Sequence, residues 1–146
     1  MIPIRDNIKS SRYPVVNTAL IAACVIVFVY QLFEPAAIEA YAFRPAYIAS
    51  LTTIQDLGYV GAGGSLLLSM FMHGGLLHIG FNMLFLWVFG DNVEDRMGVV
   101  LYLILYILSG FAAATTQILI DPDSRIPLIG ASGAIGDTLH KNGFPK

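Results

Sequence analysis

Three long apolar runs without a single charged residue constrain this chain more than any other feature. They cover residues 15–33, 65–90 and 99–120, and none contains Asp, Glu, Lys or Arg. About 20 consecutive apolar residues are enough for a helix to cross the hydrocarbon core of a bilayer. Charged residues make up only 12% of the 146, against about 25% in soluble domains. The sequence therefore predicts an all-α, polytopic transmembrane helical bundle whose first partner is the lipid bilayer.

Several function classes are not expected from this composition. The net charge is −2 and Lys and Arg are not clustered, whereas nucleic-acid binding needs clustered cations against phosphates. Cys24 is the single cysteine, so no disulfide can form within the chain. His73 and His78 are five positions apart, about 140° round a helix, and zinc needs further ligands. We therefore expect no nucleic acid, no metal and no cofactor.

The first run predicts a retained transmembrane helix with its start on the cytoplasmic side. Arg5, Lys9 and Arg12 precede it against a single Asp6, and basic flanks resist translocation. The run over residues 15–33 is longer than the apolar part of a signal peptide, which is about 7–15 residues. An anchor that stays in the membrane is therefore the preferred interpretation.

The second span is predicted over about residues 75–90. Residues 34–64 are mixed and carry scattered aromatic side chains, which favour the membrane–water interface. They predict an external loop that rests on or dips into the bilayer edge, with a plain solvated loop as the alternative. Gly74 and Gly75 mark where the loop ends and the helix begins. The polar stretch 91–98, DNVEDRMG, predicts a short cytoplasmic turn.

The third span is predicted over residues 99–120, and a fourth helix begins near residue 127. Gly110 and Ala114 form a pair of small residues that allows another helix to approach closely. Residues 127–136 have the composition of a helix start, and the tail 137–146 is polar without an apolar period. The predicted fold thus has three full spans plus the start of a fourth.

The polar residues of the spans are the candidates for chemistry, because polar groups in a membrane are costly. His78 and Asn82 are four apart and share one helix face. Ser132 lies between small residues, which leave a nucleophilic hydroxyl open to approach. The predicted topology brings all three to a similar shallow depth near the outer face. The alternative is that Ser132 and Gly136 only make a close helix contact.

Three segments resemble bacterial and archaeal members of the rhomboid family of intramembrane serine proteases. Residues 71–98, FMHGGLLHIGFNMLFLWVFGDNVEDRMG, are similar to the second-helix region of that family. Residues 127–136, PLIGASGAIG, resemble its GxSG segment, and the opening MIPIRDNIKSSRYPVVNTALI resembles the start of many prokaryotic members. The resemblance covers residues 1 to about 136, and the tail 137–146 has no family match.

The resemblance implies a six-helix core that cleaves transmembrane protein substrates near the membrane surface. For this chain it implies a prokaryotic plasma membrane. It implies Ser132 as the nucleophile, with its backbone N–H, His78 and Asn82 as donors to the oxyanion. It assigns supporting positions to Gly130, Gly133 and His73. The mechanism it implies is serine acyl transfer without metal or cofactor.

One departure from the family is large. The family's general base is a histidine on a sixth helix, and His140, the only histidine after Ser132, matches no motif. We therefore expect a truncated portion of a protease, from a shortened or frame-shifted gene or a fragment, that is inactive or nearly so by itself. Two alternatives stay open. One is a non-catalytic rhomboid-like protein that binds transmembrane helices. The other is a structural or transport subunit with an accidental match.

Overall fold

The computed structural model describes residues 13–46 and 61–130, and in these ranges the chain is helical. The elements are α1 (Val15–Phe33), α2 (Ala37–Tyr41), α4 (Gly61–Ser69), α5 (Leu76–Phe85), the π-helix η2 (Leu86–Gly90), α6 (Asp91–Met97) and α7 (Val99–Ile120). The described part of the chain forms no strand beyond one isolated bridge between Phe43 and Leu128. The predicted all-helical class is confirmed.

Three helices are long and apolar enough to cross a membrane, as the sequence predicted. They are Val15–Phe33, Leu76–Met97 and Val99–Ile120, so the chain is an integral, multi-pass membrane protein. The second helix starts after Gly75, where the paired glycines placed it. The prediction that it ends at residue 90 and turns over 91–98 was wrong, because α5, η2 and α6 run on without a break to Met97. The chain reverses only at Gly98, whose φ of +81° suits glycine.

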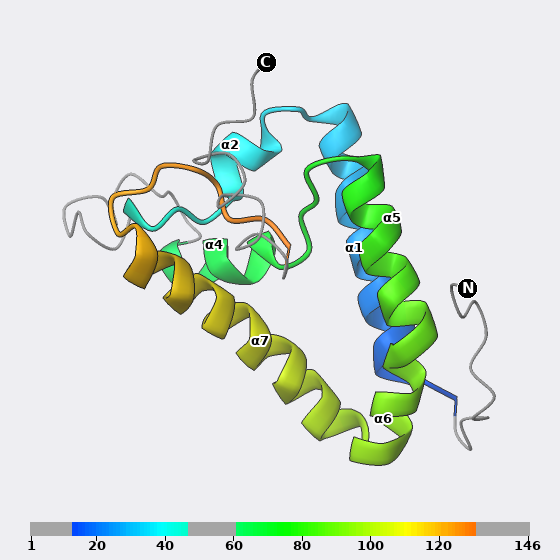
Figure 1. Ribbon diagram of the computed structural model, residues 1–146. Helices are drawn as coiled ribbons and strands as arrows, with labels where there is room; N and C mark the ends of the chain where they lie inside the picture. Colours follow the sequence, from blue (N-terminus) through cyan, green and yellow to red (C-terminus); the bar gives the residue numbers. More distant parts are fainter. Residues whose placement is uncertain (1–12, 47–60, 131–146) are drawn as a thin grey trace.

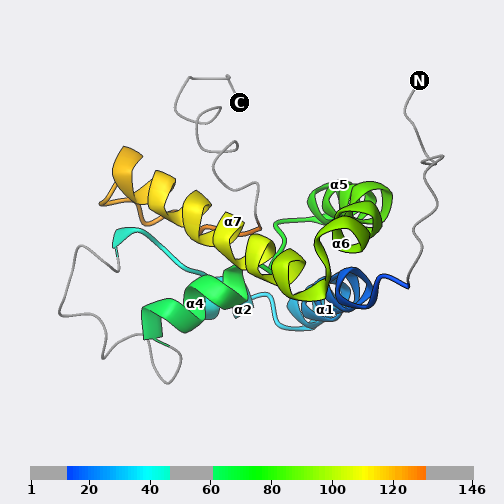
Figure 2. The same ribbon diagram turned by 90° about the horizontal axis from the view of Figure 1, so that it is seen from below.

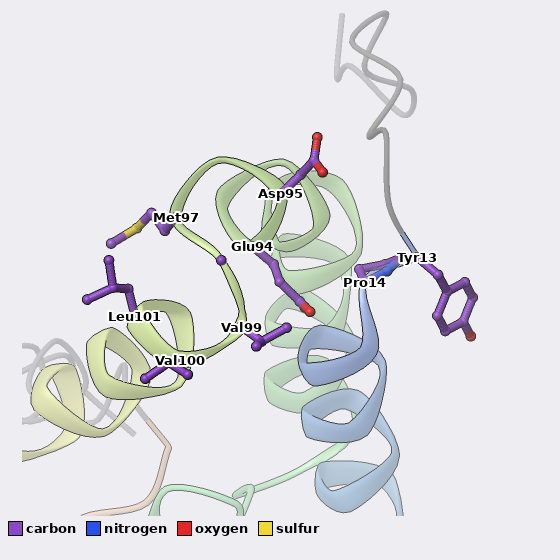
Figure 3. A pocket seen from close by; sticks show the side chains of 9 residues that line it. Tyr13, Pro14, Glu94, Asp95, Met97, Val99, Val100 and Leu101 are labelled. Atoms are coloured by element: carbon purple, nitrogen blue, oxygen red, sulfur yellow. The ribbon is translucent and has the colours of Figure 1, made fainter.

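Glu94, in this polar stretch, binds the start of α1. Its side chain is 4% exposed, and its carboxylate accepts hydrogen bonds from the backbone N–H groups of Val16 at 3.0 Å and Asn17 at 2.7 Å. The first N–H groups of a helix have no partner inside it, and negative charge there is favourable. Glu94 therefore caps α1 from a neighbouring helix. Figure 3 shows its carboxylate turned toward the start of α1, beside a cavity of about 300 Å³.

Asn17 joins the three spans just above this cap. Its Nδ2 donates to the Leu86 carbonyl at 3.0 Å, and its Oδ1 accepts from the Tyr102 hydroxyl at 2.9 Å. A π-helix holds one extra residue in its turn and disturbs the regular ladder of backbone bonds, and the Asn17 amide reaches into η2 at that place. Gly90 makes the approach possible, because a Cβ there would overlap the Asn17 side chain.

The molecule is narrow at this end and wide at the other (Figure 1). Helices α1 and α5 lie side by side in both views, whereas α7 leaves α6 and diverges from them (Figures 1 and 2). The far half of α7 packs on α4, where Ala114 joins a buried cluster with Phe43, Leu66 and Leu128. Gly110 faces Met70 so closely that a Cβ would overlap the methionine side chain. The predicted close approach at Gly110 and Ala114 is confirmed.

The segment between the first two spans is more ordered than a plain loop. Of residues 34–64, those from 47 to 60 lie outside the described residues, and the rest contains α2 and the first turn of α4. Arg44 is 7% exposed; it pairs with Glu39 and donates through Nε to the Arg125 carbonyl at 2.8 Å. The position of this segment relative to the bilayer edge stays a prediction.

The stretch leading to residue 130 is extended. The Leu128 N–H donates to the Phe43 carbonyl at 2.7 Å, and the Gly130 N–H donates to the Ser69 carbonyl at 2.8 Å. Residues 127–130 take no helical turn: Leu128 forms an antiparallel bridge with Phe43, and Gly130 has a φ of +71°. The prediction of a helix from residue 127 was therefore wrong for 127–130. The remainder of that predicted span, 131–136, and the tail 137–146 lie outside the described residues.

Candidate active site

The turn between α4 and α5 is held by a side chain from the first span. Gln31 of α1 is 7% exposed and His73 is 2% exposed. The Gln31 Oε1 accepts from the His73 N–H at 3.1 Å, and its Nε2 donates to the His73 carbonyl at 3.0 Å. Buried backbone polar groups outside a helix need such partners within the protein. One glutamine amide thus satisfies both backbone groups of this residue.

The His73 ring is buried and packs beside the His78 ring. Its Nδ1 lies 3.0 Å from the Phe71 carbonyl and must be the donor there, because a carbonyl only accepts. Its ring meets Phe28 of α1 edge-on at 6.5 Å and lies 5.2 Å from the His78 ring. Burial lowers the pKa of His73, and the nearby His78 lowers it further, against a smaller opposite effect of the hydrogen bond to the Phe71 carbonyl.

His78 and Asn82 lie one turn apart on α5, both partly buried. The Gly74 N–H donates to the Nδ1 atom of His78 at 3.2 Å. A neutral imidazole carries one proton, so a ring whose Nδ1 accepts must carry it on Nε2. His78 therefore presents an N–H donor at Nε2, and Asn82 presents its amide N–H groups from the same helix face.

Gly130 closes the site opposite these two donors. A Cβ at Gly130 would lie 2.8 Å from the His78 Nε2 and 3.5 Å from the Asn82 Nδ2. Its φ is +71°, a conformation that glycine adopts without strain. The structure thus brings together three of the predicted site residues from two distant parts of the chain, with His73 packed behind them.

Ser132 and Gly133 fall outside the described residues. Ser132 follows Gly130 by two positions, so the described chain ends beside the two donors. A cavity of about 160 Å³ adjoins Asn82 and His73 and lies between α1, α5 and α7. Its other lining residues include Cys24, Met70, Tyr106 and Ser109. Across residues 13–46 and 61–130, no three His, Cys, Asp or Glu side chains gather to hold a metal ion.

The sequence interpretation missed Gln31 and Glu94. A glutamine inside an otherwise uncharged run is a signal, because polar groups in a span are costly. The sequence does not mark Glu94 as a buried contact, since an acidic residue in a polar stretch is ordinary. Only the packing of α1 against α6 shows what it binds.

Comparison with known protein families gives a match that includes these residues. The model of the Rhomboid domain family matches residues 62–137, just over half of the chain, and this match spans His73, His78, Asn82 and Gly130. The chain belongs to the rhomboid family. The predicted family is thereby confirmed, whereas the resemblance of the opening residues 1–21 lies outside the match and stays a prediction.

Among its rhomboid relatives, one is named a protease and another is named inactive. The chain is 30% identical over 93 residues to RHOMBOID-like protein 5 of Arabidopsis thaliana, covering 59% of this chain and 30% of that protein. It is 36% identical over 74 residues to Inactive rhomboid protein 1 of Drosophila melanogaster, covering 51% and 5%. It is 36% identical over 70 residues to Rhomboid protease GluP of Bacillus subtilis (strain 168), covering 48% and 13%.

The 146 residues thus span less than a third of each of these curated relatives. No solved structure matches the chain.

Proposed function

We propose that this protein is a rhomboid-type intramembrane serine endopeptidase in which Ser132 is the nucleophile. The observation that carries the proposal is the convergence of two N–H donors on Gly130. A Cβ there would lie 2.8 Å from the His78 Nε2 and 3.5 Å from the Asn82 Nδ2, and Ser132 is two residues further along the chain. The Rhomboid domain match includes all four residues.

The donors suit the oxyanion of acyl transfer. Attack of the Ser132 hydroxyl on a peptide carbonyl breaks its π bond and leaves negative charge on the oxygen. Preorganised N–H donors that stabilise this charge are worth about 10²–10³ in rate for each donor. His78 contributes Nε2–H and Asn82 contributes its amide, with the Ser132 backbone N–H as a third donor. Gly133, next to the nucleophile in GxSG, keeps the approach to it open.

The proton of Ser132 needs a general base, and these 146 residues offer no matching candidate. A serine at its ordinary pKa is a weak nucleophile, and a general base is worth about 10²–10⁴ in rate. His140 lies in the polar tail outside any family motif. We therefore expect the 146 residues expressed alone to react at least a hundredfold more slowly than a chain that supplies a base.

The substrates in this proposal are transmembrane helices of other proteins, cut near the membrane surface. The basic residues before α1 favour a cytoplasmic N-terminus, which puts the Gly130 end of the bundle near the outer face. A prokaryotic plasma membrane is the expected location.

The test is labelling by a fluorophosphonate, a reagent that bonds to activated serine hydroxyls. The full gene product in its membrane should be labelled, and Ser132→Ala should abolish the label. Asn82→Ala should lower the labelling rate by about a hundredfold, whereas Asn92→Ala, a matched change further along the same helix, should leave it unchanged. Labelling that survives Ser132→Ala would overturn the assignment.

A second candidate is a non-catalytic rhomboid that binds transmembrane helices. The similarity to a protein named as an inactive rhomboid favours it. The coding sequence after codon 146 separates the two functions. A downstream frame with two further apolar spans and a glycine-flanked histidine supports the protease, whereas its absence together with no Ser132 labelling supports the binding protein.

A further inference from the structure

The peptide bond between His73 and Gly74 is used at both of its ends. Its carbonyl accepts from the Gln31 Nε2 at 3.0 Å, and its N–H donates to the His78 Nδ1 at 3.2 Å. A trans peptide unit is planar, so its C=O and N–H point in opposite directions. Fixing the carbonyl therefore fixes the direction of the N–H.

We propose that Gln31 is a positioning residue that sets the tautomer of His78 through this peptide. Gln31 holds the carbonyl of residue 73, the Gly74 N–H then points at Nδ1, and the proton of the His78 ring stays on Nε2. The inference deepens the proposed function and rests on it, because the Nε2–H is the donor that faces the oxyanion beside Gly130.

The other tautomer would disable this donor. With the proton on Nδ1, His78 would turn a lone pair on Nε2 toward the developing negative charge. Repulsion would then replace a hydrogen bond, and loss of one such donor lowers rates by about 10²–10³. The Gly74 N–H would also meet a second hydrogen in place of an acceptor. The direction of a single peptide thus decides whether the site has this donor.

The local sequence does little to fix the orientation of the His73–Gly74 peptide without Gln31. Two glycines, Gly74 and Gly75, follow His73, and glycine has the widest choice of backbone angles. Gln31 adds a second bond by accepting from the His73 N–H at 3.1 Å, so the residue is held at both backbone groups. Phe28, one turn earlier on α1, meets the His73 ring edge-on. The first span therefore positions the turn through both backbone and side chain.

The test reads the tautomer directly by nitrogen-15 NMR of labelled histidine side chains, in the intact protein in micelles. The chain has three histidines, so the His78 signals are assigned by their loss in His78→Asn. Wild-type protein should show one tautomer at His78, with the proton on Nε2. Gln31→Met, an unbranched apolar replacement, should give a mixture of both tautomers. Gln117→Met, the same change at a buried glutamine of α7, should leave a single tautomer.

The reactivity of Ser132 supplies the second readout. Gln31→Met should lower fluorophosphonate labelling by about tenfold, less than full loss of a donor, while Gln117→Met keeps the wild-type rate. A wild-type His78 that carries its proton on Nδ1 overturns the inference without any variant. A Gln31→Met protein that keeps the single Nε2–H tautomer and the wild-type rate overturns it as well. If Ser132 is never labelled, the proposed protease function fails, and the tautomer comparison still decides the role of Gln31.

Discussion

A buried polar side chain makes hydrogen bonds at each end of helix α1, with the second span at one end and with the turn before that span at the other, and the two interactions differ in kind. At one end the Glu94 carboxylate accepts hydrogen bonds from two N–H groups of the first turn of α1. At the other end the neutral amide of Gln31 makes hydrogen bonds with both backbone groups of His73. The first interaction meets a helix terminus, which offers only donors. The second meets an irregular turn, which offers a donor and an acceptor.

This difference assigns different tasks to the two ends. A carboxylate on unpaired helix N–H groups gains from charge and from the helix dipole, so the Glu94 end contributes mainly to folding. A neutral amide bonded to the backbone of one residue stabilises the fold less and fixes the orientation of the His73–Gly74 peptide. The Gln31 end therefore contributes mainly to the geometry of the site. Changes at the Glu94 end should lower stability with little effect on reactivity, and changes near His73 and His78 should do the reverse.

The largest expected effect is at the Glu94 end. Glu94→Ala leaves the N–H groups of Val16 and Asn17 buried without their acceptor and should lower the free energy of unfolding by about 3 kcal/mol. Unfolding by denaturant in micelles measures this loss, while labelling of Ser132 per folded molecule should stay at the wild-type rate.

Glu34→Ala is the matched control, because this exposed acid follows the other end of α1. Its effect should stay within about 0.5 kcal/mol. Equal losses for the two variants would show that the Glu94 cap contributes nothing.

The next effect in size is on chemistry. Gly130→Ala places a methyl group against the His78 Nε2 in a backbone conformation that alanine disfavours, and it should lower Ser132 labelling by about a hundredfold. Its cost in stability should be smaller, about 1–2 kcal/mol.

Gly63→Ala serves as the control, because a Cβ there meets nothing within 4 Å and alanine favours the helix by about 0.5–1 kcal/mol. Wild-type labelling in Gly130→Ala would mean that the space beside His78 is not part of the site.

The smallest effect sharpens the comparison within the Glu94 end. Tyr102→Phe removes the hydroxyl that donates to the Asn17 Oδ1 at 2.9 Å and should cost about 1 kcal/mol of unfolding free energy. Tyr30→Phe, at an exposed tyrosine of α1, should cost close to nothing. A Tyr102→Phe loss as large as that of Glu94→Ala would assign the stability of this end to Asn17 and its partners.

Much of the fold follows from local sequence, and the rest depends on contacts between distant segments. The spans were predictable because lipid demands uninterrupted apolar helices, and the face shared by His78 and Asn82 follows from helix periodicity. The extended stretch before Gly130 was not predictable, because its N–H groups bind carbonyls of Phe43 and Ser69 from far along the chain.

The site divides along the same line. His78 and Asn82 carry a motif that can be read along one helix. Gln31 acts on a residue 42 positions away, and Glu94 on residues 77 and 78 positions away, so no pattern within one segment relates them. A buried polar residue in a span marks a functional or structural contact, and only the packing of the helices shows which.

The proposed function requires that the chain after Gly130 brings Ser132 to His78 and Asn82. Disulfide trapping in membranes tests it without any need for catalysis. With Cys24→Ala removing the single native cysteine, a protein carrying Asn82→Cys and Ser132→Cys should form a disulfide under mild oxidation, because the bond requires Cα atoms about 4.4–6.8 Å apart. The pair Asn92→Cys and Ser132→Cys, at the other end of the span, should not. A bond in the distant pair and none in the near pair would contradict this placement of Ser132.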